Sequence, residues 1–288
     1  MELDLENPLI NFNPSLFLLE SDHMPSHNYV NSLKAGHLHT VSFRQEAIAS
    51  ISQFSGEFGP FLSFLAVNYL DRFLSRQRIP QHKTWVVRLV ACSCVSLAAK
   101  MMKTSFSLVE FQGDGGLVFD APTIQRTEYL ILGALKWRMR PITPFSFVSF
   151  FVPLFELEDP PLTQALKARA VEIILKAQIG RSKSSLKLLE FKPSIIAASA
   201  LLSASHQLFP LQFPCFRKAI SGCSYVNKEN MLKCYDSIQE IRGLEEEDDR
   251  AIFDTDSSFS WSVNVLEQHL SSSESEITAE RDIKRRRN

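Results

Sequence analysis

The sequence is poor in glycine and cysteine, and it has no long apolar run. Only 10 of its 288 residues are glycine, which disfavours an all-β fold with many tight turns. The 5 cysteines are an odd number and none belongs to a Cys-x-x-Cys pair, which favours reduced intracellular thiols over a disulfide framework. The longest apolar runs, residues 60–70 and 89–99, are shorter than the ~20 residues that cross a bilayer. We therefore expect a globular protein that does not enter a membrane.

Motifs for catalysis and cofactor binding are also missing. The sequence contains no Gly-x-Gly-x-x-Gly, no Walker-type phosphate loop and no His/Cys pattern with zinc spacing. The acidic run at residues 245–249 is interpreted as a solvated charge run, because a metal-dependent helical enzyme needs carboxylates that face a cavity. The formal net charge of −1 predicts no bulk attraction to nucleic acid or to an anionic membrane. We expect no catalytic residue, no metal and no cofactor.

Apolar residues recur at helical spacing through most of the chain. In the first half, the pattern predicts helices near residues 42–58, 61–74, 83–101 and 121–137. The third of these has a centre of small residues, which lets neighbouring helices approach closely. The apolar face of the last of these helices is predicted to include Leu130, Ile131 and Trp137.

The second half repeats this order with different residues. Helices are expected at residues 144–155, 162–179, 193–204 and 227–241, and the third is again rich in Ala and Ser. The prediction is an all-α fold of two tandem five-helix domains, at residues 42–140 and 141–242. A segment at residues 1–41 with a peripheral amphipathic helix precedes them, and an acidic tail at 243–288, expected to be disordered, follows them. One large irregular helical bundle remains an alternative.

Charged residues inside apolar helices are the candidate site residues. Arg44 and Asp71 lie in the first two predicted helices, where a charge must be paired or point outward, so an ion pair between them is one solution. Lys100 lies at the end of the third helix, where a cation suits the helix dipole, and Glu128 lies in the last helix of that domain. From the residues alone, Lys100 and Glu128 would be ordinary solvated surface.

Several segments resemble the cyclin family. Residues 66–75 (AVNYLDRFLS) resemble the core of the first cyclin box, and residues 96–101 (SLAAKM) resemble the end of its central helix. Residues 135–147 (LKWRMRPITPFSF) are similar to the junction into the second box of plant D-type cyclins. Residues 23–26 and 42–47 also resemble segments of that group. The likeness covers roughly residues 23–241 and is nearest to the short sixth plant subgroup.

The resemblance implies a function and roles for particular residues. It implies two tandem cyclin boxes and a regulatory subunit that binds and activates a cyclin-dependent serine/threonine kinase to promote cell-cycle entry at G1/S. Lys100 and Glu128 match the family's kinase-contacting pair, and Arg44 and Asp71 match its internal ion pair. The positions of the substrate-docking groove are Phe43, Ala47 and Ser50.

This sequence departs from the D-type pattern at three places. No cysteine precedes Cys92, so the Leu-x-Cys-x-Glu motif that docks retinoblastoma-type proteins is missing, and any such partner would bind without it. An acidic pair of the family is replaced by Met102 and Lys103 at the expected kinase face. Ser50 stands where the family usually has tryptophan, which predicts a weakened groove for substrates and kinase-inhibitor proteins.

A basic cluster lies at residues 284–287. The basic cluster Lys284, Arg285, Arg286 and Arg287 is a candidate nuclear-import signal, so we expect a nuclear protein that is also cytoplasmic. A cyclin-fold transcription adaptor without kinase activation is the alternative function, although the balanced charge does not favour a DNA-binding face. A helical enzyme is a third possibility.

Overall fold

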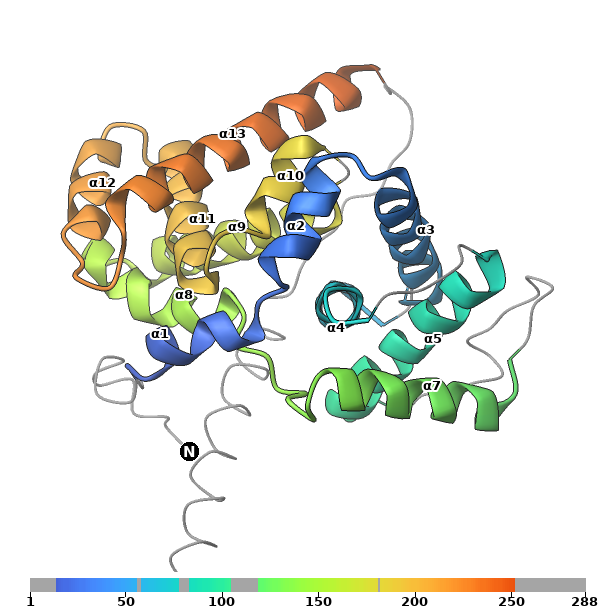
Figure 1. The fold of residues 1–288 in the computed structure, drawn as a ribbon. Coiled ribbons are helices and arrows are strands. Elements are labelled where there is room, and N and C mark those ends of the chain that lie inside the picture. Colours follow the sequence, from blue (N-terminus) through green and yellow to red (C-terminus); the bar gives the residue numbers. More distant parts are fainter. Residues whose placement is uncertain (1–13, 56–57, 78–82, 105–118, 181, 252–288) are drawn as a thin grey trace, which may run out of the picture.

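All the regular secondary structure in the described part of the protein is helical. The computed structural model describes residues 14–55, 58–77, 83–104, 119–180 and 182–251, and these contain no strand (Figure 1). The α-helices of this part are α1 (Leu16–Leu19), α2 (His27–Lys34), α3 (Leu38–Ser55), α4 (Pro60–Leu74), α5 (Thr84–Met101), α7 (Ala121–Ala134), α8 (Phe145–Phe151), α9 (Pro160–Ile179), α10 (Lys183–Leu188), α11 (Pro193–Leu208), α12 (Phe213–Ser221) and α13 (Lys228–Ala251). Two short 3-10 helices, η1 (Glu20–His23) and η2 (Val152–Phe155), follow α1 and α8.

The first domain is built around α5. Helices α3, α4 and α7 all pack against it, and its small residues Ala91, Cys92 and Ala98 are fully buried. Among the described helices α5 is long and apolar enough to cross a membrane, but most of it is buried between its neighbours. The prediction that this helix is the centre of a bundle is confirmed.

The second domain repeats the arrangement around α11. Helix α11 packs against α8, α9, α12 and α13, and its face of Ala and Ser residues is buried. Helix α13 runs along the outside of this domain (Figure 1). Two separate apolar cores result, one in each domain, as the paired Ala/Ser-rich helices predict.

The segment before α3 is not peripheral, contrary to the sequence prediction. Helix α2 lies between α10 of the second domain and α3 of the first (Figure 1), with Tyr29, Val30 and Leu33 buried. The three residues share one helical face, and that face packs against Leu186 of α10. The aromatic ring of Phe17 in α1 is buried in the second domain's core.

A buried carboxylate fixes η1 to the second domain. Glu20 is 1% exposed and its side chain accepts hydrogen bonds from the backbone N–H and the hydroxyl of Ser194, at 2.8 and 2.9 Å. Ser194 is in the first turn of α11, where unpaired N–H groups favour a negative charge. Burial nevertheless raises the pKa of Glu20, and the bonds from Ser194 oppose this shift.

Side chains of α4 form hydrogen bonds with the linker between the domains. The Tyr69 hydroxyl donates to the carbonyl of Met139 at 2.5 Å, and Nη2 of Arg72 donates to the carbonyl of Arg138 at 3.0 Å. Phe64, on another side of α4, packs edge to face on Phe145 of α8 with ring centroids 4.8 Å apart. One helix therefore contacts both the linker and the second domain.

Some element ends differ from the sequence predictions. Helix α7 ends at Ala134, so helical periodicity does not extend to Trp137, which is 66% exposed; Leu130, also 66% exposed, points away from the core that buries Ile131. Both residues were wrongly assigned to the buried face. Helix α13 continues to Ala251, beyond the predicted end near residue 241, because no proline interrupts a run rich in helix-forming Glu. Residues 252–288 lie outside the described part of the chain.

Candidate functional site

A buried ion pair joins α3 to α4. Nε of Arg44 donates to Oδ1 of Asp71 at 2.8 Å, and its Nη2 donates to Oδ2 at 3.0 Å. The two side chains are only 4% and 3% exposed, so this bidentate pair is shielded from water. Asp71 keeps Arg44 charged and raises its pKa, against the effect of burial.

Two residues that the sequence did not reveal complete this network. The Tyr29 hydroxyl donates to Oδ1 of Asp71 at 2.7 Å, which brings α2 to the pair. Nη2 of Arg44 also reaches the carbonyl of Gln178 in α9 at 3.5 Å, and Nε2 of Gln178 donates to the carbonyl of Phe64 at 3.1 Å. The signal for Tyr29 was available: a tyrosine on an apolar helix face needs a polar partner for its hydroxyl.

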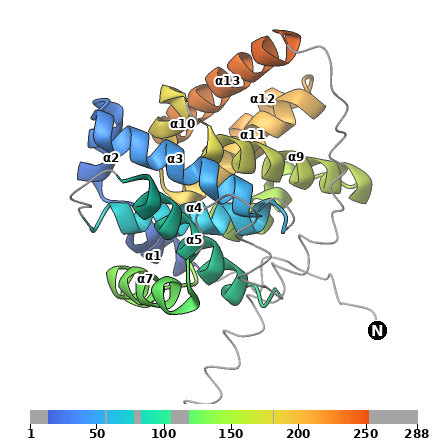
Figure 2. The same ribbon diagram turned by 90° about the vertical axis from the view of Figure 1, so that its right-hand side faces the viewer.

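The network therefore lies where the N-terminal segment and both domains meet. Figure 2 shows α3 and α4 between α7 on one side and the second-domain helices on the other. Removing one partner would leave an unpaired buried charge, which typically costs ~3–5 kcal/mol. Its role in this structure is architectural.

The second predicted pair lies on the opposite side of the first domain, where α5 meets α7. Nζ of Lys100 lies 2.7 and 2.6 Å from the two carboxylate oxygens of Glu128, and the Ser96 hydroxyl donates to Oε1 at 2.6 Å. The Glu128 side chain is 6% exposed, whereas that of Lys100 is 59% exposed. A buried carboxylate thus holds an exposed ammonium in place. The expectation of ordinary solvated surface, drawn from the residues alone, does not fit Glu128.

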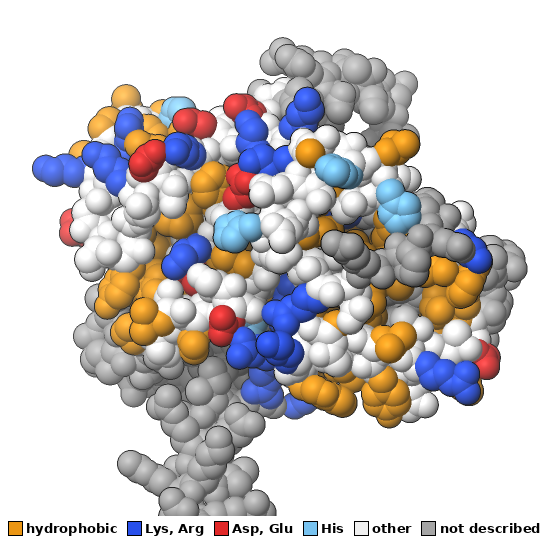
Figure 3. Space-filling model, in the orientation of Figure 1, with side chains coloured by type: hydrophobic (Ala, Val, Ile, Leu, Met, Phe, Trp, Pro, Cys, Tyr) orange, Lys and Arg blue, Asp and Glu red, His pale blue; other side chains and the backbone are white. Residues whose placement is uncertain are grey.

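Exposed apolar side chains lie on α7 and in the residues that follow it. Tyr129 is 56% exposed, Leu130 66% and Trp137 66%, and Figure 3 shows apolar side chains gathered over α7 at the lower right. Lys136 and Trp137 have φ angles of 53° and 59°, a left-handed conformation that costs a non-glycine residue ~1–2 kcal/mol. An exposed tryptophan held on a strained backbone is typical of a binding surface.

The predicted groove residues are largely inside the protein. Phe43 is 2% exposed, Ala47 0% and Ser50 7%, and the Ser50 hydroxyl donates to the carbonyl of Glu46 in its own helix at 3.0 Å. Phe54, an aromatic that could replace the missing tryptophan, is 5% exposed and lies under the guanidinium of Arg88. These positions therefore offer little apolar surface to a peptide.

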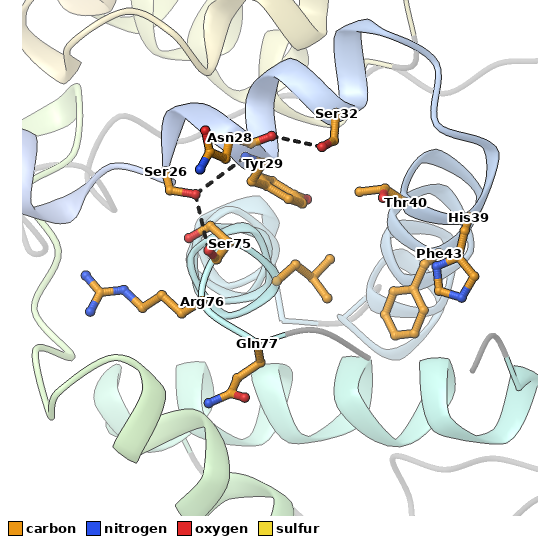
Figure 4. A pocket seen from close by; sticks show the side chains of 11 residues that line it. Ser26, Asn28, Tyr29, Ser32, His39, Thr40, Phe43, Ser75, Arg76 and Gln77 are labelled. Atoms are coloured by element: carbon orange, nitrogen blue, oxygen red, sulfur yellow. Dashed lines mark hydrogen bonds between the residues drawn. The ribbon is translucent and has the colours of Figure 1, made fainter. Parts of the chain in front are cut away.

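A cavity of about 600 Å³, lined by both apolar and polar residues, lies beside these residues, between α2, α3 and the end of α4 (Figure 4). Tyr29, Phe43 and Leu74 form its apolar part. The rest of its lining consists of polar side chains: Ser26, Asn28, Ser32, His39, Thr40, Ser75, Arg76 and Gln77. Of the groove residues, only Phe43 lines it.

The remaining predicted residues are placed as follows. Met102 and Lys103 follow α5 directly, with Lys103 exposed beside the Lys100 site. Lys284, Arg285, Arg286 and Arg287 lie outside the described residues. Within the residues that the structure describes, no group of three or more His, Cys, Asp and Glu side chains could hold a metal ion.

Comparison with known proteins identifies the family. Residues 14–140 match the cyclin N-terminal domain and residues 142–258 match the cyclin C-terminal domain. The chain belongs to the cyclin family. Putative cyclin-D6-1 of Arabidopsis thaliana is 46% identical, over 100% of this chain and 98% of that protein. Cyclin-D6-1 of Oryza sativa subsp. japonica is 35% identical, over 81% of this chain and 72% of the relative.

A solved cyclin has the same fold. The X-ray structure of a viral cyclin from herpesvirus saimiri aligns with a TM-score of 0.53 at 18% identity, covering 71% of this chain and 88% of the viral chain. The likeness to plant D-type cyclins is thus confirmed by the relatives, and the tandem cyclin fold by this structure. As a cyclin, the protein has a regulatory role.

Proposed function

We propose that this cyclin binds and activates a cyclin-dependent serine/threonine kinase and promotes entry into the cell cycle at G1/S. The observation that carries the proposal is the Lys100–Glu128 pair, with its carboxylate buried and its ammonium exposed. In cyclins these two positions are the ones that hold the kinase, as the sequence resemblance implies.

The geometry suits a protein partner. An ammonium group has three hydrogens, and two of them serve the oxygens of Glu128, so one remains to donate to a carbonyl of the kinase. The exposed Tyr129, Leu130 and Trp137 on and after α7 supply apolar and aromatic area for the centre of the interface. Lys103 adds a positive charge where many relatives carry acidic residues, which favours a kinase with an acidic group opposite.

The mechanism needs no catalytic group in this chain. The cyclin would bind better to the kinase conformer in which the catalytic Lys–Glu pair and the metal-binding aspartate are in place. Differential affinity for that conformer shifts the kinase population toward it. The second domain and the Arg44–Asp71 network would keep the binding surface rigid.

The test is co-purification of the full chain with a cyclin-dependent kinase, followed by a histone-kinase assay. Lys100→Ala should weaken kinase binding by ~2–5 kcal/mol, since it removes a charged contact at a desolvated interface. Lys218→Ala, a change at an exposed cation on α12 of the second domain, is the matched control. Circular dichroism must show that both variants are folded.

Glu128 needs a separate variant, because it is buried and its removal also affects folding. Glu128→Gln keeps the shape and the Ser96 bond but weakens the hold on Lys100. Normal kinase binding by both folded variants, Lys100→Ala and Glu128→Gln, would show that the kinase is held elsewhere. Binding without activation would favour the alternative of a transcription adaptor.

A further inference from the structure

A group of arginines meets at the junction of η1, the end of α4 and the interdomain linker. Arg72 lies in α4, and Arg76 follows it by one helical turn. Arg138 is in the linker, and its carbonyl accepts a hydrogen bond from Nη2 of Arg72 at 3.0 Å. Figure 3 shows Lys and Arg side chains gathered at the centre of this face, and Figure 4 shows Arg76 extending away from α3.

The buried member of the group has no carboxylate partner in the part of the chain that the structure describes. Arg72 is 1% exposed, yet among the described residues its guanidinium donates hydrogen bonds only to the Arg138 carbonyl and, at 3.5 Å, to the side-chain oxygen of Asn68. Its Nε has no hydrogen-bond partner within the described residues. Burial lowers the pKa of Arg72 to about 10, and Arg76 and Arg138 add to the effect. A buried cation without a counter-charge is costly, so the site favours an added anion.

One acidic side chain neutralises only part of this charge. Asp22 pairs with Nη1 of Arg138 at 2.8 Å, and both side chains are about half exposed, at 54% and 46%. No ion pair holds the exposed Arg76 in the part of the chain that the structure describes. Three guanidinium groups and one carboxylate leave two positive charges, which is the charge that a phosphate dianion would balance.

His23 lies near the same charged side chains, and one nitrogen of its ring makes no hydrogen bond to the described residues. Its Nδ1 is buried and has no hydrogen-bond partner among the described residues. Burial lowers the pKa of His23 to about 4, and Arg72, Arg138 and Arg76 lower it as well, while Asp22 opposes them. All four charged groups therefore lie near this ring.

We propose that Arg76 and Arg138, supported by the buried Arg72, bind a phosphate dianion at this junction. Guanidinium groups match the geometry of phosphate oxygens and can donate two parallel hydrogen bonds to them. The dianion contacts the exposed Arg76 and competes with Asp22 for Arg138. Its source is either a phosphorylated side chain of a protein or free phosphate, and the site does not depend on kinase binding.

The experiment measures binding to the full chain by calorimetry at low salt. The probes are inorganic phosphate, a short glycine peptide carrying one phosphoserine, and the same peptide with unmodified serine. The wild-type protein should bind the first two and not the third. Arg76→Ala should weaken binding about tenfold or more, the effect of losing a charged hydrogen bond. Arg126→Ala on α7 should leave it unchanged.

Asp22→Asn gives a change in the opposite direction. Removing the competing carboxylate should tighten binding about fivefold, which a merely structural role of these residues would not produce. Tighter binding of the phosphopeptide than of phosphate assigns the site to a protein segment, and equal affinities assign it to free phosphate. The proposal is overturned if neither probe binds at about 10 mM, or if Arg76→Ala binds as well as wild type.

Discussion

Tyr29 and Asp71 are 42 residues apart in the sequence, and their side chains share a buried hydrogen bond of 2.7 Å. The oxygen of Asp71 that accepts from Tyr29 also accepts from Nε of Arg44 at 2.8 Å. The tyrosine thus completes an ion pair that would otherwise belong to α3 and α4 alone. It ties the segment before the first domain to that domain's interior.

Tyr29→Phe should lower the free energy of unfolding by ~1.5–3 kcal/mol, the usual contribution of a hydrogen bond to a charged group. The ring and its packing remain, so the loss reports on the hydroxyl. Denaturant unfolding measures it, and Tyr129→Phe, at a tyrosine that is 56% exposed, should change little. Equal stability of Tyr29→Phe and wild type would show that the bond contributes nothing.

Acid should destabilise the protein through His23. The unfolded ring takes up a proton near pH 6.5, but the folded ring does so only near its pKa of about 4. Stability from this group is complete above pH 6.5 and is lost as the pH falls toward 4. His23→Gln should therefore lose less stability than wild type across that range in urea titrations. Parallel curves would contradict the buried position of the ring.

Lys136→Gly should raise the free energy of unfolding by ~0.5–1 kcal/mol, because glycine adopts a φ of 53° without steric cost. The gain is smaller than the strain because glycine also makes the unfolded chain more flexible. Lys218→Gly, inside α12, should have the opposite sign and cost up to ~1 kcal/mol. A destabilised Lys136→Gly would mean that the lysine side chain makes a stabilising contact.

The docking groove for Arg-x-Leu peptides should be weak, because Phe43, Ala47 and Ser50 expose so little surface. Losing on the order of 100 Å² of apolar contact costs a few kcal/mol at ~25 cal/mol per Å². Ser50→Trp, bound to the same kinase, should bind such a peptide roughly ten- to a hundredfold more tightly. Unchanged affinity, with activity on a short peptide also unchanged, would refute the idea of a weakened groove.

Replacing Lys284, Arg285, Arg286 and Arg287 by alanine should reduce the nuclear fraction of the protein in cells. A short basic cluster can act as an import signal through its charge. Fluorescence imaging of the tagged full chain measures the fraction, and alanines in place of Glu245, Glu246 and Glu247 are the control. An unchanged distribution would exclude the cluster as the signal.

Local patterns predicted most helices but not the contacts between distant segments. The apolar spacing of α3, α4, α5, α9 and α11 was sufficient to place these helices within a few residues. The largest differences are four residues: α3 begins four residues before the predicted start at 42, and α11 ends four residues after the predicted end at 204. The short α10 was missed because its six residues are too few to show a period. Apolar residues continue past Ala134, the last residue of α7, so the sequence pattern did not indicate where this helix ends. Trp137 was therefore wrongly assigned to its apolar face.

The site was predictable to a similar extent. Each pair that the resemblance indicated, Arg44 with Asp71 and Lys100 with Glu128, lies within hydrogen-bonding distance. Glu20 could not be assigned, because its partner Ser194 is 174 residues away and no local pattern links them. Long-range polar contacts depend on how whole domains pack, which hydrophobic period alone does not determine.

The position of Phe17 has a consequence for synthesis of the chain. Its ring stacks on Tyr225 with centroids 4.5 Å apart, so α1 can reach its place only after that tyrosine has left the ribosome. At about 5–20 residues per second, the intervening chain takes roughly 10–40 s to make. The first helix of the described structure is thus among the last to settle, and a nascent chain would show its apolar face to chaperones throughout that interval.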